Sequence, residues 1–490
     1  MGNTVFLVGA GPGAEMITAK GLSLIREAEV IIYDDLIDRR LLLEAGPKAR
    51  LISAGKRGHG FATPQEDING LMVRYACEGR RVVRLKGGDP LVFGRGGEEY
   101  LALEKAGIRA ELVPGVTSAV AAGERMGLPV THRGISSSFT VVTGHGAEAT
   151  AEDMKQLAAL KGTLVFMMAL SKAETIAEGL MACGMPKDTP ASIISAAYGR
   201  NEKRLDAALC DIGRLAKECQ APAVLIVGGT AKLRLRDEAR GRLHGRHFLV
   251  TGTRSFVKKL CGLLCEEDAS CDPYPCMDIE PDGSVVPEGF SKYGWLVFTS
   301  VNGVTIFFEE LARRRTDIRA LSGCRFACIG EATAGELFRH GIIADLVPSD
   351  YSSFALGNEL VRMKKPGEKD RILLLRAAQA SRELSSILEG SGFEVDERAI
   401  YSLVRPQYML PAEEPDSYDG IIFGSAGGVD SFFDDPPWIV GEDSATVLPA
   451  AFCIGRYTAL RWKERTGREA VCADNSTAEG IVRKIIETFS

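Results

Sequence analysis

Short apolar runs alternate with longer segments of helical periodicity along most of the chain. The run Thr4–Gly9 predicts a strand, Thr18–Ala28 predicts a helix, and Val30–Tyr33 predicts a second strand. Alternating strands and helices are typical of α/β architecture. The same rhythm predicts strands at Arg81–Leu85, Phe139–Gly144, Thr163–Leu170, Ala191–Ala196 and Ala223–Gly228, and helices at Gln65–Glu78, Glu98–Ala106, Ser118–Met126, Ala151–Leu160 and Lys172–Cys183. We therefore expect an α/β protein.

A charged segment divides the chain into two halves. Residues Lys232–Gly245 (KLRLRDEARGRLHG) lack a strong apolar face, and a fresh strand is predicted at His247–Thr251. A chain of 490 residues is too long for one hydrophobic core. We therefore expect one domain at 1–240, with lobes at about 1–130 and 135–240, and a second domain at 245–490.

The second half contains two pairs of similar short sequences. VFTSVNG at Val297–Gly303 resembles IFGSAGG at Ile422–Gly428, and CIGEATA at Cys328–Ala334 resembles CIGRYTA at Cys453–Ala459. Each sequence combines a strand, a small polar turn and the start of a helix. The repetition predicts two similar lobes. The strands of the second half are expected at Trp295–Thr299, Arg325–Ile329, Arg371–Leu375, Gly420–Phe423 and Ala451–Ile454.

Composition and charge narrow the class of protein. The formal charge of −6 divides into +4 for residues 1–243 (32 Lys and Arg against 28 Asp and Glu) and −10 for residues 244–490 (27 against 37). Basic runs interleaved with aromatic residues are absent, so we expect no nucleic-acid partner. The sequence has no apolar run of membrane-spanning length and begins without a signal peptide, so we expect a cytoplasmic protein away from membranes. Its 12 cysteines form no CxxC pair, which predicts reduced thiols and no metal site.

Three glycine-rich segments follow predicted strands. They are LKGGDPLVFGRGGEE at Leu85–Glu99, GAGPG at Gly9–Gly13 and PGVTS at Pro114–Ser118. Glycine lets a ligand approach the backbone closely, and the carboxyl ends of parallel strands are where open α/β sheets bind small molecules. These segments predict a small-molecule pocket.

The segment GAGPG permits two further interpretations. With Ala14 it satisfies a loose G-x-G-x-x-G/A pattern, and Asp34 lies about 20 residues further on, where a nucleotide ribose would bind. This would make the first half a nicotinamide-dependent dehydrogenase, although Pro12 is unusual in such a phosphate loop. The segment is equally compatible with a tight strand–helix turn.

From Val8 to Gly228 the chain resembles the uroporphyrinogen-III C-methyltransferases of the tetrapyrrole methylase class. The resemblance rests on VGAGPG, VIIYDDLI, GKRG, TPQEDIN, VRLKGGDPLVFGRGGEE, VPGVTSA, GLPVTHRG, VTGH, LVFMMAL and APAVLIVG, in that order. It implies two α/β lobes around S-adenosylmethionine, and the transfer of two methyl groups to uroporphyrinogen III to give precorrin-2. It also implies a role in sirohaem or cobalamin synthesis and a homodimer formed through this half.

The same resemblance assigns the site residues of the first half. Asp34 is expected to accept a proton and Lys56 to donate one, because the alkylated pyrrole must lose a proton. The residues expected at the cofactor are Pro12, Gly87, Gly88, Asp89, Val92, Thr117, Ser118, Met168, Ala197 and Ala223. Those open to substrate carboxylates are Arg57, Arg84, Arg95 and Arg133. The chain departs from the family at Ala14, where an acid is usual, and around Ala196–Arg204.

The second half resembles uroporphyrinogen-III synthase. The matching segments are VFTSVNG, CIGEATA, YSSFALGNEL, ILLLRAAQASREL, AIYSL, IFGSAGG and CIGRYTA. The resemblance implies closure of hydroxymethylbilane with inversion of ring D, without metal or coenzyme. It implies two Rossmann-like lobes, one at about 245–275 plus 403–490 and an inserted one at about 279–400. Tyr401 is expected to help the hydroxyl leave, with Ser300, Ser425 and Thr458 as donors to substrate. A ligand-binding regulatory module without activity is the alternative for this half.

Overall fold

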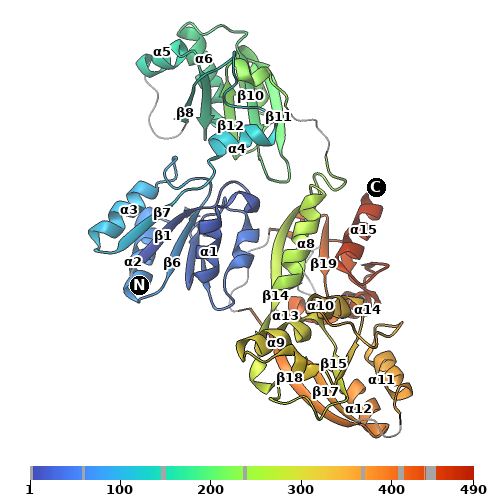
Figure 1. The fold of residues 1–490 in the computed structure, drawn as a ribbon. Helices are drawn as coiled ribbons and strands as arrows, with labels where there is room; N and C mark the ends of the chain where they lie inside the picture. The colour runs from blue at the N-terminus through green and yellow to red at the C-terminus, as the bar shows by residue number, and fades with distance from the viewer. Residues whose placement is uncertain are drawn as a thin grey trace. The chain divides into compact units, whose positions relative to one another are not determined.

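The computed structural model divides into two compact units. It describes residues 4–57, 61–144, 151–235, 240–365, 370–406, 413–434, 436 and 448–490. The first unit comprises Met1–Pro275 with Gln407–Ser490, and the second comprises Cys276–Pro406. Figure 1 draws the chain, and each unit is described here by itself.

The first lobe of the first unit is a parallel five-stranded sheet in the order β3-β2-β6-β1-β7. Its strands are β1 (Thr4–Gly9), β2 (Val30–Tyr33), β3 (Arg50–Ser53), β6 (Val82–Lys86) and β7 (Arg109–Val113). Helices α1 (Ala19–Glu27), α2 (Gln65–Cys77) and α3 (Gly96–Lys105) accompany it, with short 3-10 turns at Ala14–Met16 and Arg39–Glu44. A two-stranded ladder joins β4 (Lys56–Arg57) to β5 (Phe61–Ala62).

The period of two along each strand decides which helices cover which face of this sheet. Val30, Ile32 and Val82 pack in the core formed with α2 and α3. Ile31 and Val83 pack in the opposite core, which includes residues of α1. Because successive side chains of a strand alternate in direction, Arg84 and Lys86 belong to the same face as Val82. The strand β6 therefore directs two cations toward α2 and α3.

The second lobe is a mixed five-stranded sheet in the order β11-β10-β12-β9-β8. Its strands are β8 (Phe139–Thr143), β9 (Thr163–Met167), β10 (Pro190–Ser195), β11 (Lys203–Ala208) and β12 (Ala223–Val227). Only the β8–β9 pairing among these is parallel. Helices α5 (Ala151–Ala159), α6 (Ala173–Ala182) and α7 (Ile212–Ala216) share one core with the sheet, and α4 (Ser118–Arg125) shares the other. Figure 1 shows α5 and α6 against this sheet.

The rest of the first unit continues the α/β rhythm. Strands β13 (His247–Thr253), β19 (Gly420–Phe423), β20 (Ala451–Cys453) and β21 (Val471–Cys472) pair in parallel in that order. Helices α8 (Arg254–Glu266), α13 (Ala426–Asp434), α14 (Arg456–Thr466) and α15 (Ala478–Phe489) accompany them. Leu260 of α8 and Ile485 of α15 pack with Phe248 of β13 in a buried core.

The second unit is a sheet with helices on both faces. Its strands are β15 (Trp295–Phe298), β16 (Arg325–Cys328), β17 (Arg371–Ala377) and β18 (Glu394–Val404), all paired in parallel. The end of β14 (Ser270–Pro281) pairs antiparallel with β18. Helices α9 (Val301–Arg313) and α10 (Glu331–Arg339) cover one core, and α11 (Ser353–Arg362) and α12 (Glu383–Gly390) cover the other.

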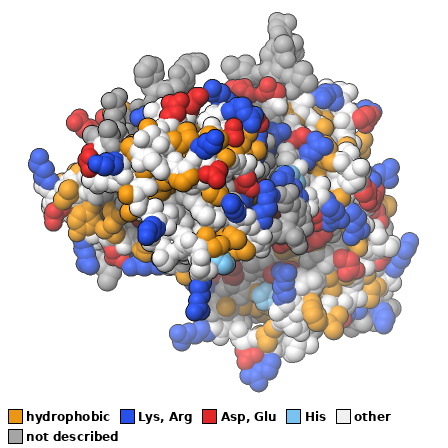
Figure 2. Space-filling view, turned by 90° about the horizontal axis from the view of Figure 1, so that it is seen from above, with side chains coloured by type: hydrophobic (Ala, Val, Ile, Leu, Met, Phe, Trp, Pro, Cys, Tyr) orange, Lys and Arg blue, Asp and Glu red, His pale blue; other side chains and the backbone are white. Residues whose placement is uncertain are grey.

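The predicted α/β class is confirmed, and most predicted elements lie within a few residues of the observed ones. The strand predicted at Thr163–Leu170 was too long, because β9 ends at Met167 and Met168 has φ of 53°. In the charged segment, Lys232 ends a 3-10 turn (Gly229–Lys232), and the other described residues, 233–235 and 240–245, form no helix or strand. No helix among the described residues is long and apolar enough to cross a membrane. On the face drawn in Figure 2, acidic and basic side chains are interspersed.

Candidate functional site

The three glycine-rich loops follow β1, β6 and β7, which are neighbouring parallel strands. Gly11 and Gly88 exchange two backbone hydrogen bonds, with both N–O distances at 3.1 Å. A Cβ atom built on Gly115 would lie 2.2 Å from the carbonyl oxygen of Gly88, and one built on Gly9 would lie 2.6 Å from Cα of Gly115. The loops therefore meet through bare backbone, which requires glycine at the contact points.

Asp89 joins two of these loops. Its Oδ1 accepts a hydrogen bond from the amide of Leu91 at 2.8 Å, and its Oδ2 accepts one from the amide of Gly115 at 3.0 Å. An ionised carboxylate has about four acceptor positions, so each oxygen retains the capacity to accept from a ligand hydroxyl or ammonium group. Asp89 is thus both a brace between the loops and a candidate ligand contact.

Other predicted cofactor residues of the first lobe lie at the same edge of the sheet. Thr117 is the N-cap of α4, and its Oγ1 accepts from the amide of Ala119 at 3.3 Å. A Cβ atom on Gly88 would lie 3.8 Å from the amide nitrogen of Ser118. Pro12 and Val92, like Gly87, are half-buried in the loops after β1 and β6. The structure therefore brings this subset together.

The predicted cofactor residues of the second lobe differ in their exposure. Met168 is 45% exposed immediately after β9, although a methionine in so apolar a run is usually part of the core. Ala197 and Ala223 are half-buried against the two cores of the lobe. Met168 is consequently available to a ligand, and the two alanines present only small surfaces.

The GAGPG turn does not have the geometry of a dinucleotide fingerprint. Such a fingerprint opens a helix directly, so that the helix N-terminus faces the pyrophosphate. Here α1 begins only at Ala19, where Thr18 is the N-cap and accepts from the amide of Gly21 at 3.1 Å. The intervening turn begins at Ala14, whose amide donates to Asp38 Oδ2 at 3.0 Å. This geometry does not support the hypothesis of a nucleotide phosphate at this turn.

Asp34 lies at the carboxyl end of β2 beside a buried network of charges. Arg84 donates from Nη2 to Asp34 Oδ1, and it donates from Nε to Glu99 Oε1 at 3.0 Å. Lys86 Nζ lies 3.0 Å from Glu99 Oε1 and 3.9 Å from Asp34 Oδ2. The side chain of Asp34 is 31% exposed, whereas those of Arg84, Lys86 and Glu99 are 2%, 3% and 0% exposed. Asp34 is therefore the solvent-facing end of the network.

The structure distinguishes among the four arginines that were predicted to bind substrate carboxylates. Arg84 is buried and its guanidinium donates to Asp34, Glu99 and the carbonyl oxygens of Ile32 and Leu85, so the role as a substrate-carboxylate partner does not fit it. Its contacts make it a residue that orients Asp34. Arg95 is exposed and pairs with Glu98 at 2.7 Å, and Arg133 is exposed in the loop before β8. The side chains of Arg57 and Lys56 lie outside the described residues.

In the second unit, Tyr401 and Ser300 are in direct contact. The phenol of Tyr401 donates to Ser300 Oγ at 2.9 Å, and the same oxygen accepts from the amide of Gly303 at 3.0 Å as the N-cap of α9. Burial raises the pKa of Tyr401, while the hydrogen bond to Ser300 and the charge of Arg376 act in the opposite direction. Arg376 is buried in β17 and lacks a hydrogen-bond partner at Nε and Nη1 among the described residues. Sequence reasoning did not single out Arg376.

The other two synthase residues lie in the first unit. Ser425 precedes α13, and its Oγ accepts from the amide of Gly428 at 3.0 Å. Thr458 is buried in α14, so its hydroxyl is not exposed as the prediction of a substrate donor requires. Ser425 repeats the capping arrangement of Ser300, as the similarity of VFTSVNG to IFGSAGG predicts.

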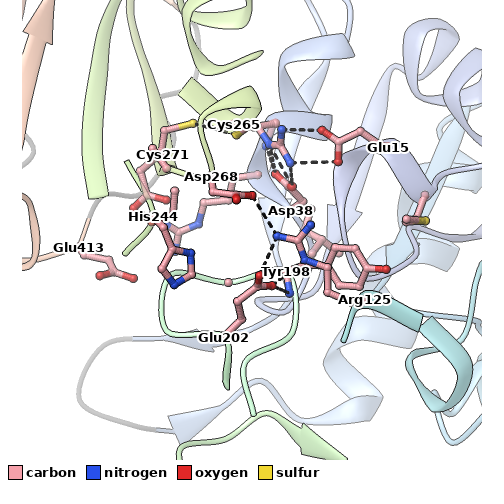
Figure 3. Close-up of a pocket in the computed structure, with 18 of the residues that line it drawn as sticks. Glu15, Asp38, Arg125, Tyr198, Glu202, His244, Cys265, Asp268, Cys271 and Glu413 are labelled. Carbon is pink, nitrogen blue, oxygen red and sulfur yellow. Dashed lines mark hydrogen bonds and ion pairs between the residues drawn. The ribbon is translucent and has the colours of Figure 1, made fainter. Parts of the chain in front are cut away.

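A separate polar cavity of about 530 Å³ lies in the first unit, and Figure 3 shows its lining. Arg125 pairs there with Glu202 at 2.8 Å and with Asp268 at 3.3 Å. The Sγ atoms of Cys265 and Cys271 are 3.9 Å apart. None of the described residues that line this cavity is a predicted site residue. Its three arginines, Arg39, Arg40 and Arg125, all pair with acidic residues of the lining, and we assign the cavity no ligand.

Comparisons with known proteins match two different families to the two halves of the chain. Residues 4–212 match the family Tetrapyrrole (Corrin/Porphyrin) Methylases, and residues 258–483 match Uroporphyrinogen-III synthase HemD. The "Porphyrin biosynthesis protein HemD" of Ruminiclostridium josui is 33% identical over 503 residues, which span 99% of this chain and 97% of that protein. The chain belongs to this family of fused porphyrin biosynthesis proteins.

Two further proteins are similar to the first half of the chain alone. The uroporphyrinogen-III C-methyltransferase of Methanocaldococcus jannaschii is 47% identical over 233 residues, covering 46% of this chain and 96% of that protein. A uroporphyrin-III C-methyl transferase from Thermus thermophilus, solved with S-adenyl homocysteine, is 37% identical over 47% of this chain and 99% of that chain, with a TM-score of 0.41. None of these comparisons supports a dehydrogenase or an inactive second half.

Proposed function

We propose that the chain is a bifunctional enzyme of tetrapyrrole biosynthesis. The second half, at 245–490, cyclises hydroxymethylbilane to uroporphyrinogen III with inversion of ring D. The first half, at 1–240, transfers two methyl groups from S-adenosylmethionine to that product and gives precorrin-2. The observation that carries the proposal is the match of one relative across 99% of the chain, over both halves. The product of the second half is thus the substrate of the first.

The glycine-lined strand ends fit S-adenosylmethionine. Gly9, Gly88 and Gly115 leave a bare backbone edge beside Asp89, whose carboxylate retains acceptor capacity. Exposed Met168 supplies an apolar contact from the second lobe. When bound, S-adenosylmethionine supplies an electrophilic methyl group. The loops then act mainly by alignment, and such positioning contributes roughly 7–11 kcal/mol to a bimolecular reaction.

Asp34 is the proposed proton acceptor for the alkylated pyrrole. Asp34 directly follows β2, and its contact with buried Arg84 holds one carboxylate oxygen in a fixed direction. Lys56 is the proposed proton donor, and Arg95 and Arg133 are proposed to bind substrate carboxylates because both are exposed. The site residues thus orient, bind and move protons, while the methyl group needs little further activation.

In the synthase half, donors at helix N-termini compensate for the negative formal charge. Ser300 and Ser425 each cap a helix after a strand, and helix N-termini favour anions. Tyr401 is proposed to assist departure of the bilane hydroxyl as water. Its protonated phenol is the form that donates, and burial, which raises the pKa of Tyr401, favours that form.

Methyl transfer is tested with the full chain, uroporphyrinogen III and S-adenosylmethionine under anaerobic conditions. We expect S-adenosylhomocysteine to accumulate and the tetrapyrrole to gain two methyl groups, as measured by mass spectrometry. Retention of a stoichiometric nicotinamide cofactor with no methylated product would contradict the proposal for this half.

Tyr401→Phe is expected to slow cyclisation by about 10- to 100-fold, because it removes the phenol that is proposed to donate to the departing hydroxyl. The rate is measured as formation of the type III isomer from hydroxymethylbilane. Tyr293→Phe is the matched control, since it also removes a buried phenol hydrogen bond, to Asp396, within the same unit. Equal cyclisation rates for Tyr401→Phe and the wild type would remove the assignment.

We also propose a localisation and an oligomeric state for the protein. We propose that the protein is cytoplasmic, since its 12 cysteines are thiols and not disulfides, as is usual in a reducing compartment. Association of two copies through the methyltransferase half follows from the family resemblance, and sedimentation of the full chain tests it.

A further inference from the structure

The methyltransferase lobe contains a buried carboxylate that sequence reasoning did not single out. Glu99 in α3 is fully buried, and its Oε1 accepts from Arg84 at 3.0 Å and from Gln65 at 3.1 Å, with Lys86 Nζ also at 3.0 Å. Its Oε2 is buried and has no hydrogen-bond partner among the described residues. A structural ion pair of this kind normally satisfies both oxygens, because an unpartnered buried oxygen is costly.

Lys86 links this carboxylate to the proposed base. It lies two residues after Arg84 on β6, so both side chains point to the same face of the sheet. Its Nζ is 3.0 Å from Glu99 Oε1 and 3.9 Å from Asp34 Oδ2. Burial, reinforced by the neighbouring Arg84 guanidinium, lowers the pKa of Lys86. The two carboxylates that Lys86 bridges act in the opposite direction on its pKa.

We propose that Lys86 and Glu99 form an electrostatic pair that sets the charge environment in which Asp34 acts as the base. The inference rests on the proposed methyltransferase function and deepens it. Both residues are positioning residues, because neither faces the exposed side of the site. With Arg84 and Asp34 they form a neutral set of two cations and two carboxylates. Removing Lys86 or Glu99 alone changes the charge around Asp34 by one unit, and removing both leaves that charge unchanged.

Other charged groups near this network stay constant in the test. Arg95 and Glu98 lie at the start of α3 and interact with Glu99 and Lys86 respectively. Asp35 and Arg39 follow β2 on the chain. Since none of these is altered, the change at Lys86 or Glu99 alone determines the sign of the effect.

The test is the pH dependence of kcat/KM for methyl transfer by the full chain, with uroporphyrinogen III as substrate. The acid limb of this profile reports the essential base of the free enzyme. K86M removes a positive neighbour of Asp34, so we expect the limb to move to higher pH. E99Q removes a negative charge, so we expect it to move to lower pH. Shifts of about 1 pH unit are expected for charges at this distance.

The double variant K86M/E99Q is expected to return the limb toward the wild-type position, because the net charge of the set is restored. K105M, which alters an exposed lysine of α3, is the matched control and should leave the profile unchanged. Binding of S-adenosylhomocysteine, measured by calorimetry, verifies that each variant retains its fold. If K86M is unstable, the direction in which the acid limb moves in E99Q and in the double variant still tests the proposal.

Limbs that remain in place, or that move in the same direction in K86M and E99Q, would overturn the inference and leave a purely structural ion pair. Failure of the proposed function has a different signature, because the wild-type chain itself would then form no methylated product. The two failures are therefore distinguishable in one set of assays.

Discussion

Asp34→Ala is expected to lower kcat for methyl transfer by about 10²–10⁴-fold while leaving cofactor affinity close to that of the wild type. The factor is the usual contribution of a positioned general base. Affinity should persist because the glycine-rich loops meet each other through backbone and through Asp89, without Asp34. The measurement pairs single-turnover kinetics with calorimetric titration of S-adenosylhomocysteine.

Two control variants test whether the loss of activity comes from loss of the base, and not from loss of the contact with Arg84 or of a carboxylate in general. Asp34→Asn keeps the shape and the contact with Arg84 but cannot accept the proton, so it should be nearly as slow as Asp34→Ala. Asp188→Asn alters an exposed carboxylate after α6 and should turn over normally. An Asp34→Asn enzyme with wild-type kcat would exclude Asp34 as the base.

Gly115→Ala is expected to have the largest effect on the cofactor site. The added Cβ would lie 2.2 Å from the carbonyl oxygen of Gly88 and 2.8 Å from Cα of Gly9, and both atoms belong to the backbone. Relief requires the loops to separate, so we expect the free energy of unfolding to fall by about 1–3 kcal/mol, the usual cost of overpacking. Cofactor affinity should fall by on the order of tenfold or more, which corresponds to about 1.4 kcal/mol.

Gly70→Ala provides the matched control. Gly70 lies in α2, and a Cβ atom there would meet no other atom within 4 Å. Alanine has the higher helix propensity, so this variant should be as stable as the wild type or more stable by about 0.5–1 kcal/mol. Thermal unfolding and titration of S-adenosylhomocysteine check both variants. Wild-type affinity in Gly115→Ala would show that the contact of these loops does not shape the cofactor site.

The predicted elements succeed where a single physical signal dominates. Strands β1, β2 and β19 match their predictions residue for residue, because each is an uninterrupted apolar run in a parallel sheet. The predictions omitted β11 (KRLDAA) and β18, whose partly exposed residues include many charges. Such strands are defined by pairing with distant residues, which apolar patterning does not reveal.

The prediction of the site residues from the sequence is limited in the same way. Glycines after strands pointed to the edge of the sheet where the three loops meet, because backbone approach requires them locally. The roles of Arg84 and Glu99 depend on contacts between β6, β2 and α3, which the chain order does not specify. The charged residues of VVRLK at two-residue spacing were the available signal, since cations on one face of a buried strand require carboxylates opposite.

The most direct test of the account is the product formed by the full chain from hydroxymethylbilane and S-adenosylmethionine together, without added uroporphyrinogen III. The account predicts a type III macrocycle that carries two added methyl groups, with two molecules of S-adenosylhomocysteine formed for each macrocycle. Non-enzymatic closure gives the type I isomer. Recovery of that isomer alone, or of an unmethylated macrocycle, would contradict the assignment of two sequential activities to this chain.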